Sequence, residues 1–368
     1  MWGIRKSAVI RSAKPARRLS IPQAALGRRH FLIGSALAQL PIAAAKPGGD
    51  AASLWTLAFQ YTPVVSGDAA AQEWRVTVPV SARLDTSLPT SGHGPPVVIF
   101  TAGFLTPSSA YGVYLDALLA AGFLVVSYDT SFETLGALVD DNDSCHLLQD
   151  VRRSLQERLG RAAAGPCFLA GHSRGAKVAV LAAAASALGE PEGLPPLAGL
   201  CLLDPANGAY EEQDPARYPS ALDTLQNQPQ LACVPMLVVG AGRGGDCVPR
   251  AKNFLGFFEA CRGPCTMVTL QDAGHLQFLD AGSNSLQLLC ATGRGVRNED
   301  VARAGANLTV AFVGSVRALI CSEHPTPVEG CQTSSGATSG SCGSTYLQAL
   351  ASSPLRYTLR VKELRGAA

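Results

Sequence analysis

Short apolar runs alternate with longer, partly polar segments over residues 95–320. Runs that are apolar at every position are typical of strands buried on both faces of a parallel sheet. The segments between them are long enough for helices, and strands alternating with helices indicate a doubly wound α/β domain. The pattern predicts an α/β fold with a mostly parallel sheet and helices on both faces. The strands are expected at 95–100, 123–129, 166–170, 200–204, 236–240 and 266–270, and the helices around 109–121, 144–159, 176–188 and 300–320.

The ends of the chain differ from this pattern. Residues 54–61 and 73–80 favour strands around a Ser-, Gly- and Asp-containing turn, which predicts a hairpin ahead of the parallel sheet. Residues 322–344 are rich in Ser, Gly, Thr and Pro and are predicted to form a loose segment, whereas 346–364 are periodic again and can return to the domain. For 368 residues with 47% hydrophobic content, one large domain is the economical interpretation. We expect a leader over 1–45, an α/β domain over 46–321 and a Ser/Gly-rich extension over 322–368.

One apolar run ends in a motif that carries chemistry. Residues 166–170 lead into Gly171-His172-Ser173-Arg174-Gly175, and an alanine-rich helix follows. This strand–turn–helix context is what a nucleophile elbow requires, with the serine hydroxyl exposed at the turn. The turn is so tight that side chains at Gly171 or Gly175 would collide with the neighbouring strand and helix. The alternative interpretation is a serine that only caps the helix.

A serine nucleophile needs a histidine base that is oriented by a carboxylate. In this fold the chain order is serine, acid, histidine, and His275 directly follows the last predicted strand. The other five histidines lie in the leader, before the serine, beside it or in the low-complexity tail, so elimination favours His275. Two acids fit the order. Asp204 follows the strand after the elbow and Asp246 follows the next strand, the commoner position, so spacing alone slightly favours Asp246.

An oxyanion hole needs two backbone N–H groups. The residue after the nucleophile, Arg174, supplies one, and the loop after strand 95–100 supplies the other, which we expect to be Phe104. The side chain of Arg174 is expected to anchor the elbow. The aromatic group around 254–258 can line a substrate cleft, but a core-facing helix is the favoured interpretation.

Charge separates the leader from the body of the chain. Residues 1–45 hold eight Lys or Arg and no acid, which is typical of an organelle transit peptide. Arg28 and Arg29 precede an apolar stretch that ends in Ala43-Ala44-Ala45, which resembles a twin-arginine signal. The two signals in series predict a plastid protein addressed to the thylakoid lumen or the thylakoid membrane surface, and a plain transit peptide is the alternative. Without these eight, 22 basic and 28 acidic residues leave a net charge of −6, which argues against nucleic-acid binding.

Metal chemistry is not expected. Cys261 and Cys265 are the only closely spaced cysteines, and no histidine lies nearby to complete a zinc site.

Three sequence blocks together resemble the chlorophyllase family. They are Gly-His-Ser-Arg-Gly at 171–175, Leu-Leu-Asp-Pro at 202–205 and Gly-His-x-Gln-Phe-Leu-Asp at 274–280. Gly-Phe-Leu at 103–105, followed by Tyr111-Gly112-Val113-Tyr114, adds to the resemblance, which spans roughly residues 54–320. The chain departs from the family at Ala176, where a second glycine is usual, and at Ala102, where a histidine often stands.

The resemblance implies an α/β-hydrolase that cleaves the phytyl ester of chlorophyll to chlorophyllide and phytol, with no metal or organic cofactor. It also implies that Asp204 is the acid of the triad, against the preference from spacing. Chlorophyll as substrate and chlorophyllide as product are then the expected partners, with peripheral contact to the thylakoid membrane. Two alternatives remain: another plastid serine lipase or carboxylesterase, and a non-catalytic pigment- or lipid-binding protein on the same scaffold.

Overall fold

The computed structural model describes most of the chain after the leader. The described residues are 50–61, 73–87, 94–130, 139–187, 197–208, 214–244, 248–280, 290, 293, 295–322 and 340–362. The leader over 1–45 and the acid candidate Asp246 lie outside them. The fold below is that of the compact unit formed by residues 42–368.

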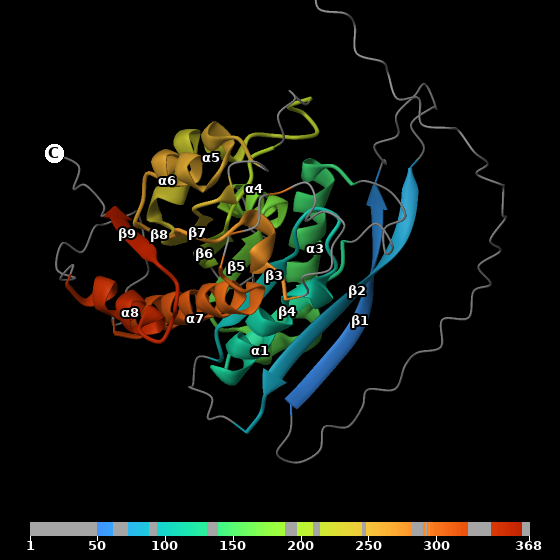
Figure 1. The fold of residues 1–368 in the computed structure, drawn as a ribbon. Coiled ribbons are helices and arrows are strands. Elements are labelled where there is room, and N and C mark those ends of the chain that lie inside the picture. Colours follow the sequence, from blue (N-terminus) through green and yellow to red (C-terminus); the bar gives the residue numbers. More distant parts are fainter. Residues whose placement is uncertain are drawn as a thin grey trace, which may run out of the picture. The chain divides into compact units, whose positions relative to one another are not determined.

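The strands of the described residues form one nine-stranded sheet in the order β1-β2-β4-β3-β5-β6-β7-β8-β9 (Figure 1). The six strands from β4 to β8 in this order run parallel, and the strands at the two edges are antiparallel. This confirms the predicted fold class and the N-terminal hairpin. The strands are β1 (Asp50–Tyr61), β2 (Trp74–Asp85), β3 (Val97–Thr101), β4 (Leu124–Tyr128), β5 (Cys167–His172), β6 (Leu197–Leu203), β7 (Met236–Ala241), β8 (Cys265–Leu270) and β9 (Tyr357–Lys362).

Helices cover both faces of the sheet and bury a separate apolar core on each. One core lies under α3 (Asp141–Leu159), α4 (Arg174–Ala187), α5 (Ala221–Asn227) and α6 (Phe254–Ala260). The other lies under α1 (Gly112–Ala120), α7 (Asn298–Ser322) and α8 (Gly340–Leu350). Every residue of β3, β4, β5 and β7 is buried, which explains why their sequences are mostly apolar, with Thr101, Ser127 and His172 as polar exceptions.

Local sequence explains how helix α3 begins and how helices α4 and α6 pack. The side chain of Asp140 caps α3 by accepting from the Asp143 amide, and acidic residues occupy the first turn of that helix. Helix α4 is rich in alanines that are buried against the sheet, because small side chains let the helix approach closely. In α6, Phe254, Phe257 and Phe258 are buried, which confirms the core interpretation of this aromatic group.

The C-terminal part of the chain returns to this unit. Strand β9 pairs with β8, and α8 packs in the same core as α7. The ammonium group of Lys362 on β9 donates to the carbonyl oxygens of Phe258, Glu259 and Cys261 at the end of α6. The last strand is therefore fastened both to the sheet edge and to a helix.

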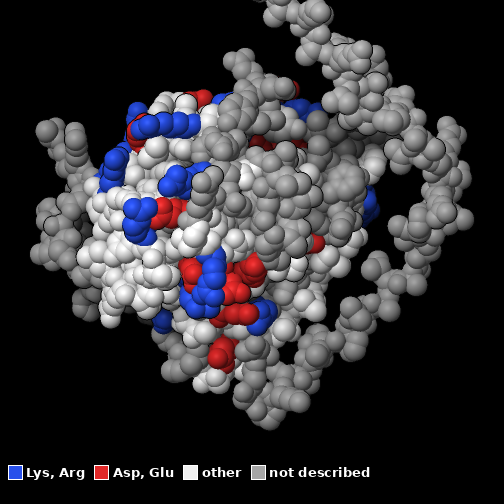
Figure 2. All heavy atoms as spheres, viewed as in Figure 1, with Lys and Arg blue, Asp and Glu red and all other residues white. Residues whose placement is uncertain are grey.

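On the face shown in Figure 2, basic side chains lie in several separate groups, and acidic side chains lie beside some of them. The helices of the described residues include none that is long and apolar enough to span a membrane.

Candidate active site

Ser173 lies at the tight turn between β5 and α4 and has a φ of 56°. A Cβ atom at Gly171 would lie 2.5 Å from the carbonyl carbon of Gly175, and one at Gly175 would lie 2.2 Å from the carbonyl oxygen of Thr101. No side chain fits at these distances, so both positions require glycine, as the tight-turn argument predicted. The turn leaves the serine hydroxyl at the carboxyl end of the central strand, with helix α4 beginning behind it.

His275 begins the short 3-10 helix His275–Phe278, which follows β8. Its Nε2 lies 2.9 Å from Ser173 Oγ. Gln277, two residues further on, stabilises this segment from within. Its Oε1 accepts from the amides of Gly274 and Gly293, each at 2.8 Å, and its Nε2 donates to the carbonyl oxygen of Val296. Sequence reasoning gave Gln277 no role, although it belongs to the Gly-His-x-Gln block.

The other imidazole nitrogen of His275 meets Asp204. Its Nδ1 lies 2.6 Å from Asp204 Oδ2, while Asp204 Oδ1 accepts from the Ala241 amide at 2.8 Å. Both side chains are buried. Because a carboxylate only accepts, Nδ1 carries the proton and Nε2 presents its lone pair to the serine hydroxyl. The structure thus brings Ser173, His275 and Asp204 into one hydrogen-bonded chain, while Asp246 lies in the undescribed segment 245–247.

Backbone strain is concentrated at this site. Among the described residues, those other than glycine with positive φ are Leu105, Ser173 and Asp204, with φ values of 52°, 56° and 36°. A left-handed conformation costs an ordinary L-residue about 1–2 kcal/mol, so surrounding contacts have to hold it. One strained residue lies in the predicted oxyanion loop, one is the predicted nucleophile and one is an acid candidate.

The side chains of the two residues predicted as oxyanion donors lie near each other. The guanidinium carbon of Arg174 is 6.0 Å from the centre of the Phe104 ring. Within the described residues, neither the Phe104 nor the Arg174 backbone N–H donates a hydrogen bond. Both amides are therefore available to an oxyanion. The Phe104 and Leu105 side chains, at 44% and 38% exposure, present apolar surface beside this position.

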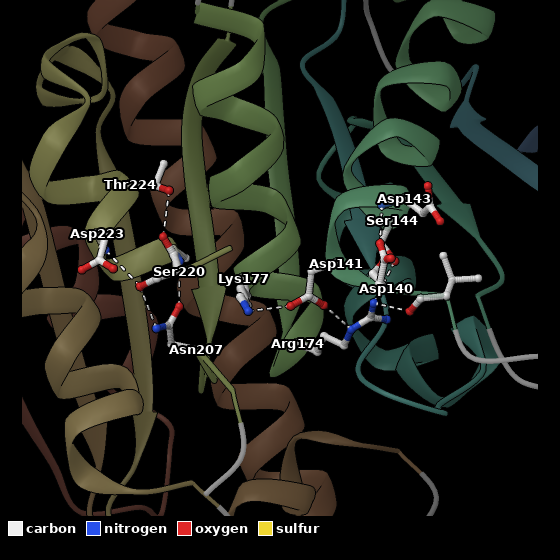
Figure 3. Close-up of polar contacts among 12 residues, drawn as sticks. Asp140, Asp141, Asp143, Ser144, Arg174, Lys177, Asn207, Ser220, Asp223 and Thr224 are labelled. Carbon is white, nitrogen blue, oxygen red and sulfur yellow. Dashed lines mark hydrogen bonds and ion pairs between the residues drawn. The ribbon is translucent and has the colours of Figure 1, made fainter. Parts of the chain in front are cut away.

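The side chain of Arg174 is turned toward helix α3 (Figure 3). Its Nε donates to Asp141 Oδ1 at 2.5 Å, and one terminal nitrogen donates to Ser144 Oγ and to the Val139 carbonyl oxygen. The other carboxylate oxygen of Asp141 accepts from the ammonium group of Lys177, which is also buried. These contacts anchor the elbow helix, as expected for Arg174, but the partner Asp141 was not found from the sequence.

The arrangement can carry out acyl transfer, because a serine hydroxyl, an imidazole and a buried carboxylate form one hydrogen-bonded chain. Among the described residues, no group of three or more His, Cys, Asp or Glu side chains could hold a metal ion.

Comparison with known proteins finds one matching family model and several similar solved structures. A family model described as Chlorophyllase matches residues 66–320. Among solved structures, a ferulic acid esterase from Streptomyces cinnamoneus has 16% identity and a TM-score of 0.50, over 80% of this chain and 96% of that chain. Peroxisomal alpha-beta-hydrolase Lpx1 from Saccharomyces cerevisiae has 12% identity and a TM-score of 0.49, over 83% of this chain and 97% of that chain. No curated protein sequence matches.

Proposed function

Because this chain belongs to the chlorophyllase family, we propose that it hydrolyses the phytyl ester of chlorophyll to chlorophyllide and phytol with Ser173, His275 and Asp204 as its catalytic triad. The fold and the family make it an α/β-hydrolase that cleaves esters. The observation that carries the proposed roles is the hydrogen-bonded chain from Ser173 through His275 to Asp204. The carboxylate fixes the tautomer of His275 that leaves Nε2 free to accept the serine proton.

Acylation starts when Ser173 Oγ attacks the ester carbonyl carbon while its proton passes to His275 Nε2. The negative charge that develops on the carbonyl oxygen is stabilised by the amides of Phe104 and Arg174. The carbon–oxygen bond to the alcohol then breaks, and His275 returns the proton to the leaving oxygen, which releases phytol. Asp204 stabilises the imidazolium that forms between these two transfers.

Deacylation repeats the same steps with water as the nucleophile. His275 Nε2 takes a proton from water, the hydroxyl attacks the acyl-serine carbonyl, and the same two amides stabilise the oxyanion. The bond to Ser173 Oγ breaks, the serine regains its proton from His275, and chlorophyllide leaves as the acid.

An apolar substrate is supported by the surface beside the nucleophile. Phe104 and Leu105 follow Gly103 in the oxyanion loop and expose large apolar side chains. Burial of such a side chain against a ligand contributes about 1.5–3 kcal/mol when complete. A long hydrocarbon or a flat macrocycle bound there would cover surface that is otherwise in contact with water.

The experiment uses the purified chain without its leader, incubated with chlorophyll a and, separately, with p-nitrophenyl butyrate. We expect chlorophyllide and phytol from the wild type and no product from Ser173→Ala, because alanine has no nucleophile. Ser220→Ala, which removes a cap hydroxyl of α5, is the matched control and should keep both activities.

Each other result has a definite meaning. Hydrolysis of the butyrate ester alone would keep the triad but assign the chain to the lipases and carboxylesterases. Chlorophyllide formed by Ser173→Ala would refute the nucleophile. If a fluorophosphonate failed to label Ser173 and neither ester was cleaved, the chain would be a non-catalytic binding protein.

The proposed location is the plastid, at or near the thylakoid membrane, because the basic leader and the pigment substrate both point there. N-terminal sequencing of the mature protein tests the two-part signal. A start close to residue 46 supports it, and a start well before residue 40 contradicts it.

A further inference from the structure

The residue directly before the nucleophile has a side chain that the mechanism above does not use. The His172 imidazole points into the core and is 1% exposed. It lies beside the ring of His275, with the ring centres 4.9 Å apart, and stacks on Phe278. A fully buried imidazole next to the catalytic base needs partners for both nitrogens, because an unsatisfied buried polar group is costly.

Both nitrogens have partners, and the partners fix where the proton is. Nε2 lies 3.0 Å from the backbone carbonyl oxygen of His275, which can only accept, so Nε2 carries the proton. Burial and the neighbouring His275 hold the pKa of His172 well below its usual value, so the ring is neutral and Nδ1 accepts. The hydroxyl of Tyr111 lies 2.9 Å from Nδ1 and is the donor.

The same hydroxyl reaches the oxyanion loop. Its oxygen accepts from the Gly103 amide at 2.9 Å, and Gly103 directly precedes Phe104. A Cβ atom at Gly103 would lie 3.1 Å from both His172 Nδ1 and the Tyr111 oxygen. The loop therefore sits directly against this pair of side chains. Hydrogen bonds run from Gly103 N–H to Tyr111, from Tyr111 to His172, and from His172 to the carbonyl oxygen of the base.

A second contact fastens the segment that begins with His275 to the residues on either side of Tyr111. Asp280, at the end of the segment that begins with His275, donates its amide to the Ala110 carbonyl oxygen and accepts the Val113 amide with its carboxylate. Ala110 and Val113 flank Tyr111 at the start of α1. The segment that begins with His275 is thus joined to the oxyanion loop through His172 and Tyr111, and to the start of α1 through Asp280.

We propose that Tyr111 and His172 are positioning residues that hold the Phe104 amide and the His275 imidazole in fixed relation to Ser173. The inference rests on the proposed esterase function. A proton-transfer geometry set by His275 and an oxyanion site set by the Phe104 loop must be correct at the same time, and small displacements of such groups slow the reaction. Neither residue touches the substrate. Their effect passes through Gly103 and through the backbone of the base.

Tyr111→Phe tests the proposal because it keeps the ring and removes the hydroxyl. Loss of a direct oxyanion donor lowers kcat about 100- to 1000-fold, and a displaced donor should cost less, about 10- to 100-fold. With p-nitrophenyl butyrate we expect kcat to fall by this factor while KM changes less than about twofold. The affinity for a trifluoromethyl ketone, which forms a tetrahedral adduct with the serine, should fall in parallel.

Tyr128→Phe is the matched control. It removes another fully buried tyrosine hydroxyl, which is bonded to Thr101 Oγ1 at 2.9 Å on the strand that precedes the same loop. Its kcat and inhibitor affinity should stay within about twofold of the wild type. If Tyr111→Phe matched this control, or if only KM changed, the positioning role would be wrong. Activity retained by Ser173→Ala would refute the esterase mechanism instead, so the two failures are distinguishable.

A measurement on the wild-type chain covers the case in which Tyr111→Phe does not fold. Nitrogen-15 spectra of labelled histidine should show one neutral imidazole protonated at Nε2 that does not titrate between pH 5 and pH 8, and that His172→Gln lacks. A His172 signal with the proton at Nδ1, or one that titrates in this range, would overturn the proposed hydrogen-bond chain.

Discussion

At the scale of single residues, a few residues of the site adopt strained backbone conformations. Leu105, Ser173 and Asp204 adopt positive φ values although none is glycine. For Ser173 the conformation presents the hydroxyl, and for Asp204 it accompanies hydrogen bonds to His275 and to the Ala241 amide. Leu105 has no comparable polar reason. Its strained backbone presents an apolar side chain to solvent in the predicted oxyanion loop, and we propose that this side chain contacts the substrate.

Leu105→Asn should separate apolar contact from backbone geometry. Asparagine tolerates the left-handed conformation, so stability should be unchanged or rise by up to about 1 kcal/mol. The lost contact should lower kcat/KM for p-nitrophenyl palmitate about 3- to 10-fold, equivalent to about 1 kcal/mol, with p-nitrophenyl acetate little affected. Leu347→Asn, at a somewhat more exposed leucine on α8, is the control and should change neither rate. An equal loss on both esters would indicate damage to the loop instead.

At the scale of elements, α3 and α4 are joined by one buried carboxylate. Asp141 at the start of α3 is 3% exposed and accepts from both Arg174 and Lys177 on α4. Lys177 is itself 1% exposed, and burial lowers its pKa while Asp141 opposes that effect. Helix α4 is thus held to α3 by the ion pair between Asp141 and Lys177, and either of these two buried groups would be an uncompensated charge without the other.

Asp141→Asn should therefore be costly. Removing one partner of a buried ion pair typically lowers the free energy of unfolding by about 3–5 kcal/mol, since the remaining charge is uncompensated. Urea unfolding would measure the loss. Asp150→Asn on the same helix removes an exposed pair with Arg153 and should cost less than about 1 kcal/mol. Equal effects of the two substitutions would mean that Asp141 contributes no more than a surface charge.

At the scale of the whole molecule, the buried His172 makes stability depend on pH. In the unfolded chain His172 has the ordinary histidine pKa of about 6.5, whereas in the folded chain its pKa is much lower, so the ring stays neutral until the pH is well below this value. Below about pH 6.5 the unfolded state therefore holds more protons, and stability rises with pH and falls on acidification. The slope from this residue is about 1.4 kcal/mol per pH unit.

Urea unfolding at several values between pH 5 and pH 8 checks this dependence. His172→Gln should be less stable than the wild type at neutral pH but should lose less on acidification. A slope unchanged in His172→Gln would show that other groups cause the acid sensitivity.

The sequence by itself determined the architecture and the places where chemistry is concentrated. Fully apolar runs predicted the parallel strands, and Gly171 and Gly175 marked the tight turn because nothing larger fits there. The elbow motif singled out Ser173, and chain order with elimination singled out His275. These are local signals, since a strand, a tight turn or a helix cap is specified by residues that are neighbours in the chain.

Only the tertiary structure decided which distant groups meet. Spacing slightly favoured Asp246 and the family resemblance favoured Asp204. In the structure the carboxylate of Asp204, 71 residues before His275, lies against the imidazole. Asp141 and Arg174 are 33 residues apart, and Tyr111 and His172 are 61 apart, so no local pattern announces either contact. Such contacts depend on how neighbouring strands order their loops at one edge of the sheet, which packing of the whole chain sets.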